Sequence, residues 1–160
     1  MRVPAPGKNQ RLGVCGAFNP VTGQMLSRVA RKITGREIAG VLGKLAARAR
    51  RTGRLVIVVL DNAQVHKGRL AKRAWARHAD WIRPLWLPAY CPDLNDIERV
   101  WKREKENYFA NSLPPSVDAF ERKVRRRFRT LAHVRCRVRF PRPARRVAVS
   151  RMIKNILKAA

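Results

Sequence analysis

The chain contains the stretch Leu55-Val56-Ile57-Val58-Val59-Leu60-Asp61-Asn62, an unbroken apolar run that ends in a carboxylate. Six consecutive aliphatic residues rich in Val and Ile predict a strand that is buried on both faces. A strand of this kind lies in the middle of an α/β sheet, where ligands bind at the carboxyl ends of strands. Asp61 is therefore placed either to do chemistry or simply to turn the chain, as Asp and Asn often do.

The residues before this strand predict a hairpin and a helix. Apolar stretches at 12–18 and 25–33 flank turn residues, whereas residues 1–10 predict an irregular entry. Apolar residues then recur at helical spacing, with Thr34 and Glu37 in a capping-box pattern and Gly53 as the stop signal. The first third of the chain therefore combines strands with a long helix.

The residues after the strand continue the alternation of helix and strand. A second amphipathic helix is predicted over residues 70–78, and a strand over 81–87, in which Pro84 favours a sheet edge or a bulge. Helices over 94–108 and 117–131 follow. The chain is long enough for a single core, so we expect one α/β domain over residues 1–131.

The charge indicates a polyanionic partner. The 160 residues include 37 lysines and arginines against 10 acids, a formal net charge of +27. Such an excess is typical of nucleic-acid-binding surfaces. Codon bias in a GC-rich gene also enriches arginine, but it does not explain the scarcity of acids. Nucleic acid is the expected partner.

The excess of basic over acidic residues is concentrated at the C-terminus, where residues 121–160 hold 15 lysines and arginines and one acid. Residues 132–160 form a separate basic tail in which residues 152–157 could make a short helix. The Arg-, Pro- and Val-rich part of this tail fits a disordered phosphate-binding segment. It fits equally an out-of-frame translation of GC-rich DNA.

The cysteine content and hydropathy exclude several classes of protein. Cys15, Cys91 and Cys136 are odd in number and far apart, so neither a disulfide framework nor a zinc site is indicated. No apolar run is long enough to span a membrane, and no signal-type segment follows the basic N-terminus. We expect a soluble, cytoplasmic protein.

A second carboxylate, Glu98, lies within the apolar stripe of the helix predicted over 94–108. It follows Leu94 by four residues and precedes Trp101 by three, and these spacings share one helical face. A carboxylate on a buried face requires a partner. An arginine salt bridge and a metal ion fit this requirement equally, while Asp93 or Asn95 fits a helix cap.

Asp61 and Glu98 would form one site if the fold brings them together. Two carboxylates from separate elements suit Mg²⁺, which completes its coordination with waters and substrate phosphates. Two such ions can activate a nucleophile and stabilise a leaving oxygen in phosphodiester chemistry. In a strongly basic chain, DNA is a consistent substrate.

Two motifs resemble the DDE domain of mariner-type transposases from bacterial insertion sequences. The first is Leu60-Asp61-Asn62-Ala63 followed by His66. The second is Leu87-Pro88-Ala89-Tyr90-Cys91-Pro92-Asp93-Leu94-Asn95-Asp96-Ile97-Glu98-Arg99-Val100-Trp101-Lys102. The resemblance covers residues 3–131.

This resemblance implies a ribonuclease-H-like α/β fold, a mixed sheet flanked by helices that lacks its first strand. It implies that Asp61 and Glu98 are the second and third acids of a catalytic triad that binds Mg²⁺ or Mn²⁺. The expected supporting residues are Asn62 and His66 beside the metal and Tyr90 and Asn95 in the loop that presents Glu98; a lone His is also often structural. The expected DNA contacts are Arg99, Lys102, Arg125, Arg126 and Arg127, and the expected location is the bacterial cytoplasm, at the nucleoid.

The chain departs from the family at its first acid, because no Asp or Glu precedes Glu37. The upstream DNA-binding helices of the family are missing too. We therefore expect a transposase fragment, inactive alone, that is either a remnant or the second frame of a split gene. Its expected partners are DNA at the transposon ends and target, an upstream-frame half and a second copy of the chain. The alternative is a non-catalytic, basic nucleic-acid-binding protein.

Overall fold

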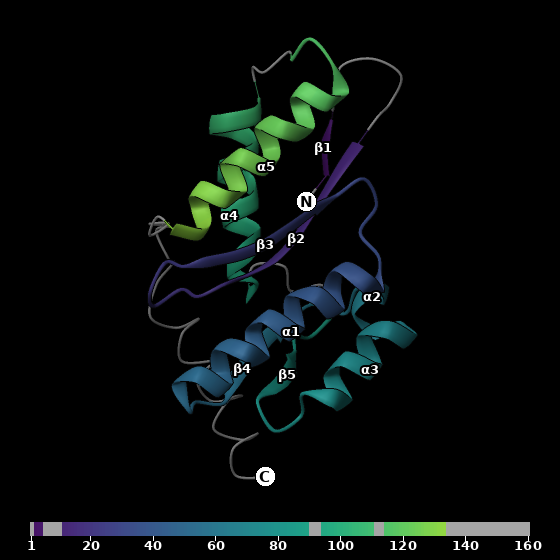
Figure 1. Cartoon of the computed structure of the whole chain (residues 1–160), viewed down its shortest axis with the longest axis vertical. Helices are drawn as coiled ribbons and strands as arrows, with labels where there is room; N and C mark the ends of the chain where they lie inside the picture. The colour runs from purple at the N-terminus through teal and green to yellow at the C-terminus, as the bar shows by residue number, and fades with distance from the viewer. Residues whose placement is uncertain (1, 5–10, 90–93, 111–113, 134–160) are drawn as a thin grey trace.

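The computed structural model describes residues 2–4, 11–89, 94–110 and 114–133, and these residues form a mixed α/β structure (Figure 1). The order of elements is β1 (Arg2–Pro4), β2 (Arg11–Phe18), β3 (Met25–Ala30), α1 (Gly35–Thr52), β4 (Val56–Leu60), α2 (Gln64–Lys67), α3 (Arg69–Arg77), β5 (Ile82–Trp86), α4 (Asp96–Glu104), the π-helical segment η2 (Lys105–Phe109) and α5 (Val117–His133). The α/β class predicted from the sequence is confirmed. Among the described helices, none is long and apolar enough to cross a membrane.

The strands form two sheets. One has the order β1-β2-β3 and is antiparallel throughout, and the other is the parallel pair β4-β5. The predicted hairpin is confirmed, with Phe18 opposite Met25 beside its turn. The irregular entry predicted for residues 1–10 is wrong for Arg2–Pro4, because pairing with Arg11–Gly13 gives this short segment the backbone hydrogen bonds it needs.

The position of β4 also differs from the prediction. In the described residues β4 pairs with β5 alone, and Val56 to Val59 are half-buried; only Leu60 of this strand is fully buried. The apolar run therefore forms an edge strand instead of a central one, because no described strand lies on its other side. The prediction that Pro84 marks a sheet edge is confirmed, since β5 pairs through Val58 and Pro84 with β4 only.

Helix α1 begins and ends where the sequence predicts. The hydroxyl of Thr34 accepts a hydrogen bond from the Arg36 amide at 3.2 Å, and Glu37 accepts one from the Thr34 amide at 2.9 Å. Gly53 ends the helix in the left-handed conformation, with φ 63°. These caps satisfy backbone groups that the helix leaves without partners at its two ends.

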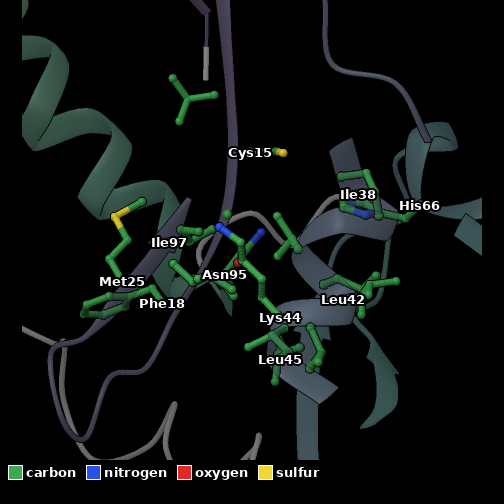
Figure 2. Close-up of a pocket in the computed structure, with 18 of the residues that line it drawn as sticks. Cys15, Phe18, Met25, Ile38, Leu42, Lys44, Leu45, His66, Asn95 and Ile97 are labelled. Carbon is green, nitrogen blue, oxygen red and sulfur yellow. The ribbon is translucent and has the colours of Figure 1, made fainter. Parts of the chain in front are cut away.

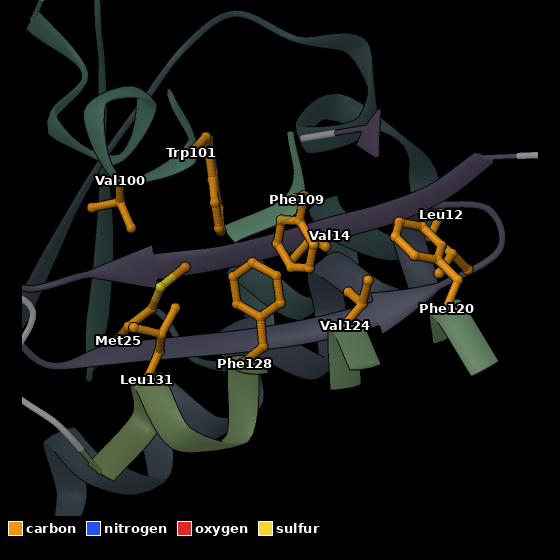
Figure 3. Close-up of a cluster of buried hydrophobic side chains, with 10 residues drawn as sticks. All are labelled: Leu12, Val14, Met25, Val100, Trp101, Phe109, Phe120, Val124, Phe128 and Leu131. Carbon is orange, nitrogen blue, oxygen red and sulfur yellow. The ribbon is translucent and has the colours of Figure 1, made fainter. Parts of the chain in front are cut away.

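Side chains of β2 alternate between two cores. Leu12 and Val14 point to a core that also contains Met25 and the apolar faces of α4, η2 and α5 (Figure 3). Cys15 and Ala17 point to the other core, which is built from α1, α3 and β5. Helices therefore cover both faces of the β1-β2-β3 sheet, as the two-residue period of a strand requires.

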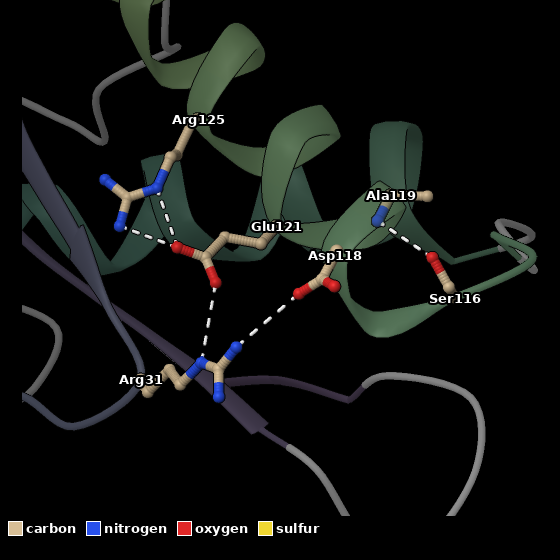
Figure 4. A network of polar contacts seen from close by, with 6 residues as sticks. All are labelled: Arg31, Ser116, Asp118, Ala119, Glu121 and Arg125. Carbon is tan, nitrogen blue, oxygen red and sulfur yellow. Dashed lines mark hydrogen bonds and ion pairs between the residues drawn. The ribbon is translucent and has the colours of Figure 1, made fainter.

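Ion pairs hold α5 against the end of β3. Arg31 lies 3.5 Å from Asp118 and 3.7 Å from Glu121, and Glu121 also pairs with Arg125 at 2.7 Å (Figure 4). The Ala119 amide donates a hydrogen bond to the Ser116 hydroxyl at the start of the helix. These contacts fix the direction in which α5 leaves the loop before it.

Candidate active site

Asp61 directly follows β4, and it makes the local contact of a turn residue. Its Oδ1 accepts a hydrogen bond from the Ala63 amide at 3.0 Å, which is the local contact of an Asx turn. Its side chain is 50 % exposed and lines a cavity of about 1470 Å³. The turn therefore orients the carboxylate while leaving part of it accessible to a ligand.

His66 lies beside Asp61 on the short helix α2. Its Nε2 is 3.6 Å from Asp61 Oδ1. Burial lowers the pKa of His66, and the charge of Asp61 opposes this effect without reversing it. A neutral imidazole next to the carboxylate is therefore the expected state at neutral pH.

Asn62 connects the end of β4 to the end of β5. Its Nδ2 donates to the Leu87 carbonyl at 2.7 Å, and its Oδ1 accepts from Lys67 at 2.9 Å. Lys67 also lies over the ring of Trp86, 5.3 Å from the centroid. Asn62 thus positions the segments on both sides of Asp61.

Glu98 is in the first turn of α4 and lines the same cavity as Asp61. The prediction that its side chain lies on the buried face of the helix is wrong, because Glu98 is exposed. The buried residues of this helix are Val100, Trp101 and Glu104. Asn95 stands at the N-cap without a side-chain capping bond in the described structure, and it also lines the cavity (Figure 2).

The buried carboxylate of this helix is Glu104, which the sequence reasoning missed. It is 1 % exposed and accepts hydrogen bonds from Arg127 at 2.7 Å and from Arg103 at 2.8 Å. Helical spacing in the sequence does indicate a buried position for Glu104, because it follows Val100 by four residues and Trp101 by three. The salt-bridge reading considered for Glu98 therefore describes Glu104.

The first 121 residues of the 160-residue chain match the family described as DDE superfamily endonuclease. The chain belongs to this family. The resemblance to the DDE family is thereby confirmed, and Asp61 and Glu98 lie within the matched residues.

A curated relative of this DDE-family chain is the protein named "Insertion element IS630 uncharacterized 39 kDa protein" from Shigella sonnei. The two are 27 % identical over 131 residues, which is 82 % of this chain and 38 % of the relative. The chain thus spans well under half the length of that protein.

Among solved structures, a chain of a simian T-cell lymphotropic virus intasome in complex with the PP2A regulatory subunit B56 gamma is similar. The TM-score is 0.47 at 17 % identity, and the similarity covers 89 % of the DDE-family chain and 55 % of the intasome chain.

Among the described residues of the DDE-family chain, the carboxylates that line the cavity are Asp61, Asp96 and Glu98. In the described part of the chain, no three or more His, Cys, Asp or Glu residues gather in a group that could hold a metal ion. Asp61 and Glu98 offer hard oxygen ligands at one cavity. Mg²⁺ often takes only one or two protein carboxylates, so this pair fits such an ion.

The basic residues predicted to contact DNA differ in what else they contact. Lys102 is exposed and lies 3.9 Å from Glu106, and Arg125 pairs with Glu121. Arg127 lies against Glu104 and over the ring of Tyr108, at 4.5 Å from the centroid. The exposed side chain of Arg126 has no ion pair within the described residues.

The remaining predicted residues are Arg99 and Tyr90. Arg99 is half-buried on α4, and Tyr90 lies outside the described residues. The tail predicted over residues 132–160 lies outside them as well, except for its first two residues, Ala132 and His133, which end α5.

Proposed function

We propose that this chain is the transposase domain of an insertion sequence, a domain that descends from metal-dependent DNA cleavage and strand-transfer enzymes. The observation that carries the proposal is that Asp61 and Glu98, from separate elements, line one cavity in a chain of this family. Asp61 and Glu98 hold the metal, and Mg²⁺ or Mn²⁺ when bound supplies Lewis-acid activation of the phosphodiester.

The protein residues around the metal ligands have distinct tasks. The turn contact from Ala63 holds the Asp61 carboxylate in one orientation, and Asn62 fixes the strand ends on which that turn stands. His66 is kept neutral by burial, so it adds no positive charge to compete with a cation beside Asp61. The net charge of +27 attracts DNA from solution.

This chain has Asp61 and Glu98 as two of the three acids that the family resemblance implies. We therefore expect it to bind the metal more weakly than a complete triad and to cleave DNA poorly. Loss of one member of a catalytic set commonly reduces rates by orders of magnitude. A polypeptide that supplies a further carboxylate would restore activity, and an upstream-frame half of a transposase is such a partner.

Iron-directed cleavage tests the metal site without requiring turnover. Fe²⁺ with ascorbate cleaves a polypeptide close to the bound ion, and mass spectrometry locates the cuts. We expect fragments ending near residues 61 and 98 in the parent, and their loss in Asp61→Asn and Glu98→Gln. Asp80→Asn is the matched control, because Asp80 is exposed and does not line the cavity.

Two results would contradict the proposal. One is a cleavage pattern that persists in both variants while their thermal unfolding matches the parent. The other is Mg²⁺-dependent cleavage of terminal-repeat DNA by the chain alone that neither Asp61→Ala nor Glu98→Ala reduces.

A second candidate function is non-catalytic DNA binding through the basic C-terminal region, because residues 121–160 carry 15 lysines and arginines and one acid. Deletion of that whole range would remove Val124, Phe128 and Leu131 from the core, so the deletion must begin after His133. Salt-dependent binding that is lost on deleting residues 134–160, but retained in Asp61→Asn and Glu98→Gln, favours this function.

A further inference from the structure

Exposed basic side chains cover the outer surface of α1 and α3. The two helices carry nine lysines and arginines and one acid, Glu37. Glu37 is engaged at the start of α1, where it accepts hydrogen bonds from the amide and the hydroxyl of Thr34. Lys44 and Arg48 line the cavity. The exposed basic residues of the two helices that do not line it form what we call the basic face: Arg36, Arg50, Arg51, Arg69, Lys72, Arg73 and Arg77.

The helices α1 and α3 lie side by side and run in the same direction (Figure 1). A Cβ added at Gly35 would lie 3.2 Å from Cβ of Leu70, and one added at Gly43 would lie 3.8 Å from Nε2 of His78. The start of α1 thus meets the start of α3, and the middle of α1 meets the residue that follows α3. Because glycine has no Cβ, the two helices approach closely and their outer side chains share one surface.

The cations of the basic face have no ion pair with an acid among the described residues. On α5, by contrast, Arg125 pairs with Glu121 and Arg127 pairs with Glu104. An arginine that is already paired must give up its partner before it binds a phosphate, whereas a cation of the basic face gives up none. Like charges that gather without counter-charges also repel one another, and a bound polyanion relieves this repulsion.

His78 lies where the charges of the two helices converge. Burial lowers the pKa of His78 most, and the charges of Arg50 on α1 and Arg77 on α3 lower it further. The two guanidinium groups therefore act on the same imidazole from different helices. A phosphate bound between them would oppose their effect on His78.

The shape of the basic face suits an extended polyanion. Arg36 and Arg50 are fourteen residues apart, which is about 21 Å along a helix axis. Duplex DNA presents a phosphate about every 3.4 Å along each strand, so this distance covers roughly 6 base pairs. The cations stand on an open surface and not around the cavity, so they can follow a phosphate backbone.

Part of the basic face lies far from Asp61. Arg50 is near the end of α1, shortly before β4 begins at Val56, and Arg77 ends α3 shortly before β5 begins at Ile82. The parallel strands β4 and β5 start at this end of the sheet, whereas Asp61 follows the last residue of β4. Five strand residues at about 3.3 Å each separate the two ends by about 16 Å. A phosphate at Arg50 and Arg77 is therefore not the phosphate that reaches Asp61.

We propose that the basic face of α1 and α3 binds the phosphate backbone of duplex DNA, at a place apart from the metal site. The stretch of DNA held there differs from the stretch that enters the cavity. The inference rests on the proposed function only for the choice of DNA as the polyanion, and the binding needs neither metal nor cleavage.

The salt dependence of duplex binding to the full chain provides the test. The probe is a fluorescein-labelled DNA duplex longer than the basic face, of about 20 base pairs, in buffer with EDTA. Arg50→Gln and Arg77→Gln should each reduce the dependence of log K on log salt by about 0.9, and the double variant by about twice as much. The control is Lys105→Gln, at an exposed position on η2, which should keep the slope of the parent.

The stability of the variants separates DNA binding from a structural role. Without DNA, the Arg50→Gln, Arg77→Gln double variant should unfold at the same temperature as the parent or at a higher one, because it has lost repulsion and no ion pair. A parent-like salt slope in the double variant, or a slope change as large in Lys105→Gln, would overturn the proposal.

Two further measurements locate the bound duplex. In proton NMR titrations, saturating duplex should raise the pKa of His78, because phosphate opposes the charges of Arg50 and Arg77; an unchanged pKa of His78 would overturn the assignment. Asp61→Asn and Glu98→Gln should bind the duplex in EDTA with the slope of the parent. Loss of binding in these two variants would show that the metal site holds the duplex and would overturn the inference. Iron-directed cuts that persist in them would contradict the metal site alone.

Discussion

Arg127 on α5 donates a hydrogen bond from Nε to Oε2 of Glu104 on α4 at 2.7 Å, and a second from Nη2 to Oε1 at 3.1 Å. This two-point contact joins two helices of one core around a carboxylate that is 1 % exposed. Arg127→Ala should therefore lower the free energy of unfolding by about 2 kcal/mol, because the buried carboxylate loses two charge-assisted hydrogen bonds and keeps the one from Arg103. Urea denaturation measures this change.

The matched control is Arg125→Ala, two residues earlier on the same helix. Arg125 pairs with Glu121 near the surface and is 45 % exposed, so its loss should cost at most about 1 kcal/mol. Equal destabilisation by the two substitutions would contradict the structural role given to Glu104.

Glu104 also predicts how stability depends on pH. Burial, the largest single influence, raises the pKa of Glu104, but the hydrogen bonds and charges of Arg127 and Arg103 together outweigh it and leave the pKa below its ordinary value of 4.5. The folded protein thus holds the proton less tightly than the unfolded chain does. The stabilisation is complete above pH 4.5 and is lost as pH falls through the lower pKa of the folded state.

The measurement is the free energy of unfolding between about pH 6 and pH 3. Glu104→Gln should be less stable than the parent at neutral pH and should lose less stability on acidification. Glu106→Gln, at an exposed position on η2, should keep the acid dependence of the parent. An unchanged acid slope in Glu104→Gln would refute this assignment.

Asn62 lies next to Asp61 and Asn95 lines the cavity, but substitutions of the two should differ in their effect on stability. Asn62 makes two side-chain hydrogen bonds, to the Leu87 carbonyl and from Lys67. Asn62→Ala should cost about 0.5–1.5 kcal/mol. Asn95 caps α4 without a side-chain bond in the described structure, so Asn95→Ala should cost less than about 0.5 kcal/mol, below the usual loss at an N-cap. Thermal unfolding of the two variants, measured side by side, compares these two losses of stability. A larger loss in Asn95→Ala than in Asn62→Ala would contradict the prediction.

The sequence predicted those elements whose signals are local. The capping box of Thr34 and Glu37 and the stop at Gly53 are set by residues a few positions apart, and they are confirmed. The edge position of Pro84 follows from its missing N–H. The helix predicted over 117–131 is likewise present as α5, and its buried residues Phe120, Val124, Phe128 and Leu131 recur at helical spacing.

The errors concern packing between distant segments. Six aliphatic residues predict a buried strand only if other elements cover it, and the described residues leave the edge of β4 beside a cavity. Helical spacing placed Glu98 on the face of Trp101, but the first turn of α4 lies at the cavity, while Glu104 meets Arg127 across 23 positions. Such pairings depend on how α5 docks, which local periodicity does not encode.

The end of α1 offers a test of backbone conformation. Gly53 adopts φ 63°, and a Cβ there would meet no atom within 4 Å. Gly53→Ala should therefore destabilise by about 1 kcal/mol through backbone strain alone, and Gly53→Asn should cost less because Asn tolerates the left-handed region. Gly16→Ala is the contrasting variant, since a Cβ at Gly16 would overlap the Leu26 carbonyl oxygen. Chemical denaturation should rank Gly16→Ala as the most destabilised of the three.

Arg126 and Arg127 are neighbours, but their substitutions should affect DNA binding differently. The side chain of Arg126 is exposed and has no ion pair within the described residues, whereas Arg127 lies against Glu104 and Tyr108. If α5 contacts DNA phosphates, Arg126→Ala should reduce the dependence of log K on log salt by about 0.9, the release of one counterion. The Arg126→Ala variant should remain as stable as the parent.

Arg127→Ala should instead lower the stability of the protein. Under conditions where this variant stays folded, the salt slope should be nearly unchanged, because the charge of Arg127 is already matched by Glu104. Fluorescence anisotropy with a duplex at several salt concentrations measures the slopes. A larger slope change for Arg127→Ala than for Arg126→Ala would show that the ion pair with Glu104 opens when DNA binds.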